Sequence, residues 1–256
     1  MITIVKIGGN VLDDAPALTH FLQQFSQWNG PKILVHGGGK LATRTAENMG
    51  IKAQMVDGRR ITDQAMLDIV TMVYAGLTNK QVVAQLQANG CNAIGLTGAD
   101  GNVIQAQLRP KTPIDYGFVG DLTADSVQAD LLLQWLNQGL TPVFSAITHD
   151  GNGQLLNTNA DTIAATLAEA LAPLADTQLV YCFEKKGVLR DAEDDSTVIS
   201  EITATVFEQL KADQVVHAGM IPKLSNALSA VAKGVKNVYI KQANDLLDER
   251  AGTRIR

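Results

Sequence analysis

The sequences ITIVKIGG at residues 2–9 and KILVHGGG at residues 32–39 determine the predicted fold class. Each begins with an apolar run rich in β-branched residues, which indicates a buried strand, and each ends in consecutive glycines. Residues 15–28 lie between them and carry apolar side chains at helical spacing. A strand, a crossover helix and a second strand predict parallel pairing, with ligands bound beyond the carboxyl ends of the strands.

The same alternation continues along the rest of the chain and predicts an α/β fold with a mostly parallel central sheet sandwiched by helices, a three-layer αβα arrangement. Residues 103–123 contain Pro110 and Pro113 and predict a β-hairpin insertion. One domain is expected over 1–256, with lobes 1–173 and 174–256 meeting near Pro173. The other expected helices are 40–49, 64–88, 125–137, 161–171, 204–211, 222–233 and 244–249, and the other expected strands are 92–97, 142–147, 179–183 and 237–240.

Composition narrows the class of protein. The chain has 256 residues, 46% hydrophobic and 18% charged, as is ordinary for a globular enzyme, and its net charge of -5 argues against a nucleic-acid partner. No apolar run has the ~20 residues of a membrane span, and residues 1–9 lack the pattern of a signal peptide, so a cytoplasmic location is expected. Cys91 and Cys182 form no CxxC pair, so neither a zinc site nor any other metal site is expected.

Lys6 lies inside the first apolar strand, just before Gly8 and Gly9. A lysine buried there needs an anion beside it, and the glycines allow backbone amides to approach a phosphate closely. The pattern therefore predicts a phosphate clamp. An edge-strand lysine that reaches solvent is the alternative.

The second glycine turn, Gly37 to Gly39, follows His36 and precedes a helix, which makes it a candidate anion site. A histidine followed by three glycines also forms the oxyanion hole of some hydrolases, but this chain has no Gly-x-Ser-x-Gly segment for the nucleophile. They also fit a dinucleotide-binding fingerprint with Asp57 about twenty residues on, so an NAD(P)-dependent oxidoreductase is the competing function. We interpret His36 itself as structural.

Three further segments carry polar residues beyond what local structure needs. Arg60, after Arg59, can fork onto a carboxylate, although a solvated surface pair is the alternative. Residues 157–161, NTNAD, hold more amide and carboxylate groups than one helix cap requires. Lys223 occupies a helix first turn, where the macrodipole disfavours a cation unless an anion binds there.

Together these segments resemble the acetylglutamate kinase family, of the amino-acid-kinase fold, almost from end to end. The resemblance rests on residues 6–9, 36–39, 58–62, 157–161, 219–223 and 252–254. The sequences of residues 116–120, YGFVG, and 181–186, YCFEKK, are similar to those found in the Bacteroidetes form of the family. The resemblance implies ATP-dependent phosphorylation of the γ-carboxylate of N-acetyl-L-glutamate in arginine biosynthesis, with N-succinyl-L-glutamate as an alternative acceptor.

The resemblance also implies roles for particular residues. Lys6, Asp161 and Lys223 are expected to be catalytic, with Asp161 orienting both lysines. The backbone of Gly8, Gly9 and Gly38 is expected to hold the phosphoryl group. Substrate-binding positions are Gly38, Gly39, Arg60 and Asn157, and nucleotide-binding positions are Glu184, Lys186, Gly187, His217 and Gly219.

The nucleotide segment departs from the family pattern, because residues 183–188 read FEKKGV where a Ser/Thr-Asp-Val-x-Gly-Val sequence is usual.

The resemblance implies ATP with Mg²⁺ carried by the nucleotide, an acylglutamate lobe followed by an ATP lobe, and a homodimer of the arginine-insensitive kind. The expected partner is a small molecule, with no nucleic acid and no membrane. A non-catalytic amino-acid-binding regulator that kept the fold is a further alternative.

Overall fold

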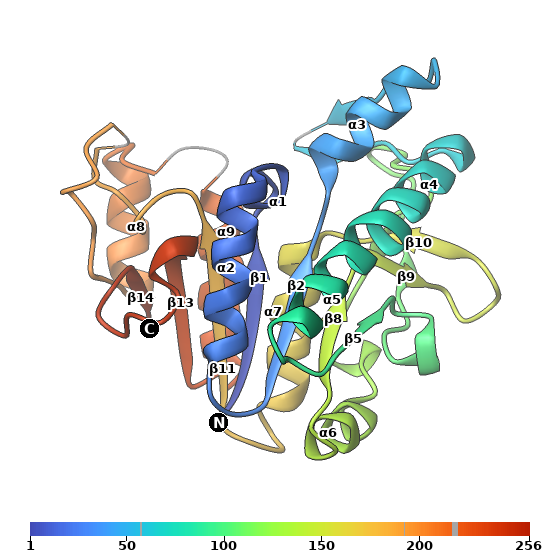
Figure 1. The fold of residues 1–256 in the computed structure, drawn as a ribbon. Helices are drawn as coiled ribbons and strands as arrows, with labels where there is room; N and C mark the ends of the chain where they lie inside the picture. Colours follow the sequence, from blue (N-terminus) through green and yellow to red (C-terminus); the bar gives the residue numbers. More distant parts are fainter. Residues whose placement is uncertain (57, 192, 217–219) are drawn as a thin grey trace.

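The computed structural model describes residues 1–56, 58–191, 193–216 and 220–256, with Pro222 described in its backbone only. Its central sheet has eight strands in the order β12-β14-β13-β11-β1-β2-β8-β5 (Figure 1). Neighbouring strands pair in parallel, except that β13 and β14 are antiparallel. The mostly parallel sheet expected from the sequence is therefore confirmed. The strands are β1 Ile2–Ile7, β2 Lys32–His36, β5 Ala93–Leu96, β8 Thr141–Phe144, β11 Thr177–Phe183, β12 Glu201–Ile202, β13 Asn237–Gln242 and β14 Thr253–Ile255.

Helices cover both faces of the sheet. In Figure 1, α1, α2 and α5 lie in front of it and α7 and α9 lie behind it. Successive strand residues point to opposite faces, so Ile4 belongs to one buried cluster and Val5 to the other. The three-layer arrangement follows, since both faces of the strands are apolar. The helices are α1 Gly9–Asp13, α2 Ala15–Gln27, α3 Gly39–Asn48, α4 Gln64–Val70, α5 Asn79–Ala88, α6 Ala129–Asn137, α7 Ala160–Leu171, α8 Ala204–Ala212 and α9 Ile221–Ala232.

Short hairpins lie beside the carboxyl ends of the strands. The expected hairpin insertion is present as β6 Gln107–Leu108 paired with β7 Gly120–Asp121. Two other antiparallel pairs were not expected, β3 Met55–Val56 with β4 Arg59–Arg60 and β9 Ile147–His149 with β10 Leu155–Asn157. Single helical turns occur at η2 Asp100–Asn102, η3 Ala124–Ser126 and η4 Ala243–Asp245.

Three expected helices differ in the structure. The helix expected over 125–137 begins only at Ala129, after the short turn η3. The helix expected over 64–88 is interrupted by a π-helical segment, η1 Thr71–Thr78, between α4 and α5. The helix expected over 244–249 is wrong: only η4 forms there, and the Lys241 ammonium donates to the Asp248 carbonyl, 2.6 Å away. The chain turns back at Gly252, whose φ is +90°, and continues as β14 against β13.

Strand register places the two glycine turns side by side. Ile7 at the end of β1 pairs with His36 at the end of β2 and with Cys182 on β11. Because the three strands are parallel, the segments that follow them leave the sheet at the same edge. The candidate site lies there.

Candidate active site

The first residues of the site are the glycines that end β1 and β2. The Gly8 amide donates to the Cys182 carbonyl at 2.8 Å, so this turn stays tied to β11. Gly38 has φ +150° and precedes α3. A Cβ atom at Gly38 would lie 2.9 Å from Cδ1 of Tyr74, so only glycine fits. Gly38 and Gly39 both line the cavity of the site.

The buried side chain of His36 holds the second glycine turn in place. The ring is fully buried, with Nδ1 2.8 Å from the Gly37 carbonyl oxygen and Nε2 3.0 Å from Nδ2 of Asn79. Nδ1 is therefore the donor to Gly37, while Nε2 accepts from the amide of Asn79. Burial lowers the pKa of His36 from 6.5 to about 4, and the nearby Lys80 ammonium adds to this. The structural interpretation of His36 agrees with these contacts.

The buried neutral ring predicts a pH-dependent stability. Its folded-state pKa lies below the unfolded value, so its contribution is complete above pH 6.5 and is lost as the pH falls toward 4. At pH 4.5 we expect wild type to have lost about 2–3 kcal/mol of unfolding free energy through this group. Urea unfolding of His36→Gln should lack that portion of the pH dependence.

The matched control is His20→Gln, because His20 is an exposed histidine on α2. It should retain the wild-type slope of unfolding free energy against pH. Equal slopes in His36→Gln and His20→Gln would show that the buried ring does not titrate as described.

Lys6 and Asp161 form the charged floor of the site. The Lys6 ammonium lies 2.6 Å from Oδ1 of Asp161, and the two side chains are 13% and 15% exposed. The contact is an ion pair, and none of the described residues forms a hydrogen bond with Oδ1. Asp161 lies in the first turn of α7, where the helix dipole favours a carboxylate, and Asn159 caps that helix by accepting from the amide of Thr162 at 3.0 Å. The ammonium can therefore turn toward an anion in the cavity while Asp161 holds it.

Arg60 is held at the opposite wall. Its Nη2 donates to the Gly39 carbonyl at 2.9 Å and to Oγ1 of Thr43 at 2.8 Å, and the residue is 8% exposed. Tyr74 on the π-helix lies against the same group: burial raises the pKa of its phenol, and the Arg60 charge opposes that rise. No carboxylate in the described part of the chain pairs with this buried guanidinium, so it is suited to receive one from a ligand.

Asn157 ends β10 beside Arg60. Its Nδ2 donates to Oγ1 of Thr62 at 3.0 Å, and the Thr62 hydroxyl donates to the Arg60 carbonyl at 3.1 Å. Residues from two distant segments are thereby fixed relative to each other. None of the described residues donates a hydrogen bond to the Asn157 amide oxygen, which leaves that oxygen for a ligand.

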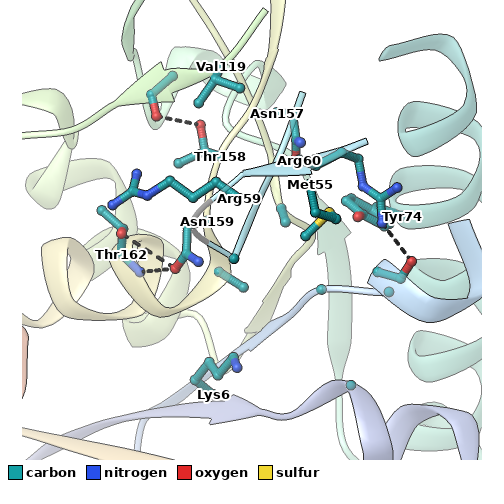
Figure 2. Close-up of a pocket in the computed structure, with 18 of the residues that line it drawn as sticks. Lys6, Met55, Arg59, Arg60, Tyr74, Val119, Asn157, Thr158, Asn159 and Thr162 are labelled. Carbon is teal, nitrogen blue, oxygen red and sulfur yellow. Dashed lines mark hydrogen bonds between the residues drawn. The ribbon is translucent and has the colours of Figure 1, made fainter. Parts of the chain in front are cut away.

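These groups surround a cavity of about 250 Å³ (Figure 2). Of the predicted site residues, it brings together Lys6, Gly9, Gly38, Gly39, Arg60 and Asn157 at its lining, with Asp161 behind Lys6 and Gly8 at the adjoining turn. Its volume suits a small molecule. The other lining residues are Ile7, Gly37, Met55, Gly58, Arg59, Tyr74, Arg109, Val119, Gly120, Asp121, Ala146, Thr158, Asn159, Ala160 and Thr162.

The cavity carries more cationic groups than the sequence indicated. Arg59 is exposed and extends from β4 in the opposite direction to Arg60 (Figure 2). Arg109 pairs with Asp121 through Nε and Nη2 and lies 5.3 Å from the Tyr116 ring centroid. Arg59 thus presents a guanidinium to the cavity that none of the described residues neutralises.

The predicted nucleotide side is more dispersed. Lys223 lies over the Phe183 ring, 5.0 Å from its centroid, and none of the described residues, Asp161 included, forms an ion pair with it. Gly187 lines a smaller apolar cavity of about 90 Å³ with Lys185, Val188, Leu189, Val215, Val216 and Met220. Glu184 and Lys186 are exposed and do not line it. His217 and Gly219 lie outside the described residues, as does Asp57.

Sequence reasoning missed Tyr74, Arg109 and Phe183. An aromatic residue within an apolar helical pattern is typical of a core position, so Tyr74 gave no local signal. Phe183 likewise fits a buried strand. The contacts of Tyr74 and Phe183 join separate segments of the chain, and those of Arg109 lie within a hairpin. Only the adjacent arginines at 59–60 indicated surplus charge.

Two features are absent from the described part of the chain. No group of three or more His, Cys, Asp or Glu side chains is placed to hold a metal ion. None of its helices combines the length and the apolar character needed to cross a bilayer.

Comparison with known sequences places these features in context. The model of the amino acid kinase family matches residues 1–242. An acetylglutamate kinase of Cytophaga hutchinsonii is 56% identical over 246 residues, covering 96% of this chain and 92% of that protein. One from Bacteroides thetaiotaomicron is 52% identical over 255 residues, covering 100% of this chain and 98% of that protein.

Solved structures agree on the fold. The structure of smu.665 from Streptococcus mutans UA159 is similar with a TM-score of 0.80 and 28% identity, covering 99% of this chain and 98% of that one. An N-acetylglutamate synthase of Neisseria gonorrhoeae, complexed with coenzyme A and N-acetyl-glutamate, has a TM-score of 0.83 at 21% identity. It covers 99% of this chain and 59% of that one, so the likeness concerns the fold alone.

Proposed function

This chain belongs to the amino acid kinase family, and on that basis we propose that it transfers the γ-phosphoryl group of ATP to the side-chain carboxylate of N-acetyl-L-glutamate. The product is an acyl phosphate, and the reaction is a step of arginine biosynthesis. Family membership displaces the NAD(P)-dependent oxidoreductase considered from the glycine pattern. The observation that carries the proposal is the Lys6–Asp161 pair, 2.6 Å apart, on the floor of a cavity whose far wall is Arg60.

The chemistry explains why the site holds cations rather than a general base. A glutamate side chain has a pKa of about 4.3, so the attacking carboxylate is already ionised at neutral pH. The obstacle is to bring one anion onto another. Catalysis therefore depends on positioning and on positive charge aimed at the transferred group.

Each charged group then has a proposed role. Lys6 and the amides of Gly8, Gly9 and Gly38 hold the phosphoryl oxygens during transfer. Asp161 orients the Lys6 ammonium, which its 2.6 Å contact supports. Lys223 approaches from the nucleotide side and stabilises the charge that develops on the leaving β–γ bridge oxygen.

The acceptor is held at the other end. Arg60 forks onto the α-carboxylate, because its guanidinium is buried and lacks a carboxylate partner among the described residues. Asn157 binds the acylamide and the carboxylate, and the backbone of Gly39 adds a further contact. These groups keep the γ-carboxylate directed at Lys6.

The nucleotide belongs to the second lobe in this proposal. Lobe 1–173 binds the acylglutamate, and lobe 174–256 binds ATP through Glu184, Lys186, Gly187, His217 and Gly219. Mg²⁺ would arrive bound to the nucleotide and would offset the charge of its phosphates. The cytoplasm, where ATP is available, is the proposed compartment.

A homodimer is the proposed assembly. Met72 and Leu77 on the π-helix are 52% and 48% exposed, and large apolar side chains on one element favour burial against a second copy. No nucleic-acid or membrane partner is proposed.

A coupled assay of ADP release tests the reaction. Purified protein with ATP, Mg²⁺ and N-acetyl-L-glutamate should release ADP only when the acceptor is present. A protein that binds the acceptor in calorimetry but releases no ADP would instead be the non-catalytic regulator.

A second acceptor, N-succinyl-L-glutamate, is favoured by one observation. Arg59 places an exposed guanidinium at the cavity in addition to Arg60. An acetyl group has no anionic group that could pair with the Arg59 guanidinium, whereas a succinyl group ends in a carboxylate. Side-by-side kinetics on the two acceptors therefore decide whether the acyl pocket discriminates.

We expect Arg59→Leu to separate the two acceptors. Because Arg59 is exposed, its contact with a succinyl carboxylate is worth about a tenfold change in kcat/KM at most. The variant should lose that factor with N-succinylglutamate and stay within about twofold of wild type with N-acetylglutamate. Equal changes with both acceptors would remove Arg59 from acyl recognition.

A further inference from the structure

Lys223 has an unusual environment for a catalytic cation. It lies in the first turn of α9, which contains no acidic residue, so the helix dipole repels its charge. Its partner in the described part of the chain is the face of Phe183, with the ammonium 5.0 Å from the ring centroid. An aromatic face attracts a cation at that distance through its quadrupole. The ring thus offsets an unfavourable position of the charge.

Phe183 is itself rigidly placed. It is the last residue of β11, 7% exposed, and is held in the sheet opposite Gln242 of β13. Its Cβ atom lies 3.3 Å from where a Cβ atom on Gly8 would be. Phe183 therefore lies against the first glycine turn through its Cβ atom and under the Lys223 ammonium through its ring.

We propose that Phe183 is a positioning residue, whose ring face holds the Lys223 ammonium beside the Gly8–Gly9 turn before ATP binds. A cation already in place costs no reorganisation when charge develops on the bridge oxygen. An aliphatic side chain of similar size fills the same space and leaves the ammonium free to move into solvent. This inference rests on the proposed function, since it requires Lys223 to act on the transferred phosphate.

The test combines Phe183→Leu and Phe183→Tyr with Lys223→Met, and measures kcat and both KM values by ADP release. Phe183→Leu should lower kcat about 3- to 30-fold, the range of a cation–π contact, with KM for the acylglutamate within about twofold of wild type. Phe183→Tyr keeps the ring face and should stay within about twofold. In the Lys223→Met background, Phe183→Leu should have no further effect on kcat.

The matched control is Phe207→Leu, because Phe207 is another buried phenylalanine under a lysine, with Lys211 4.6 Å from its centroid on α8. It should lower the melting temperature as Phe183→Leu does but leave kcat unchanged. That comparison separates loss of core packing from loss of the ring face.

The outcomes distinguish the inference from the function on which it rests. If Lys223→Met keeps kcat within a few-fold of wild type, the proposed role of Lys223 fails and the inference fails with it. If Lys223→Met is strongly impaired, the inference alone is overturned by any of three results. The first is that Phe183→Leu leaves kcat unchanged. The second is that Phe183→Tyr lowers kcat as much as Phe183→Leu does. The third is that Phe183→Leu lowers kcat by the same factor in the wild-type and Lys223→Met backgrounds.

Discussion

Lys6→Ala is expected to lower kcat by about 10²–10³-fold, because it removes a charge aimed at the transferred phosphoryl group in a largely desolvated site. The side chain is only 13% exposed, so solvent cannot replace the ammonium efficiently. KM for the acylglutamate should change far less, since the proposed contact strengthens in the transition state. Steady-state ADP release with both substrates varied measures the two parameters separately.

Lys40→Ala is the control for this prediction. Lys40 is exposed in the first turn of α3, close in sequence to the second glycine turn, and does not line the cavity. It should leave kcat and KM near wild type. If Lys6→Ala kept kcat within a few-fold of wild type, the phosphate clamp would be assigned to the wrong residue.

Arg60→Met should chiefly raise KM for the acylglutamate, by about 10- to 100-fold. Charge-assisted hydrogen bonds contribute roughly 1.5–3 kcal/mol each, and 1.4 kcal/mol is tenfold in affinity. Methionine keeps an apolar stem, while the guanidinium, whose Nη1 lies 3.8 Å from Sδ of Met66, is lost. KM for ATP should stay close to wild type, which the same assay measures.

Arg60 also supports the second glycine turn, since it donates to the Gly39 carbonyl. Thr43→Val therefore serves as a companion variant: it removes the hydroxyl bonded to Nη2 but keeps the charge. It should raise KM much less than Arg60→Met. A loss in kcat without a rise in KM for Arg60→Met would place the guanidinium on the phosphate instead of the substrate carboxylate.

The surroundings of Arg60 show why a site is harder to predict than a fold. The sequence indicated the arginine itself, because two adjacent guanidinium groups follow a turn. It did not indicate the phenol of Tyr74, which reaches Arg60 from a π-helical segment expected to be ordinary helix. π-Helical segments are frequent at functional sites, but their position depends on packing and not on local preference.

The C-terminal region gives the same lesson for secondary structure. Residues 244–249 have helical preference, yet the chain forms one short turn and returns as β14. Pairing with both β13 and β12 buries Ile255 and outweighs the local preference. Competition between local and long-range contacts is not visible in spacing alone.

The amino-acid sequence by itself determined the layers of this fold and the location of its glycine turns. Both are encoded locally, by apolar periodicity and by residues that permit unusual backbone angles. Only the tertiary structure decided that Asp161 pairs with Lys6, that Tyr74 lies against Arg60, and that the Lys223 ammonium lies over the Phe183 ring. Those contacts join residues far apart in the chain, and their geometry follows from the register of the parallel strands and the packing of helices on them.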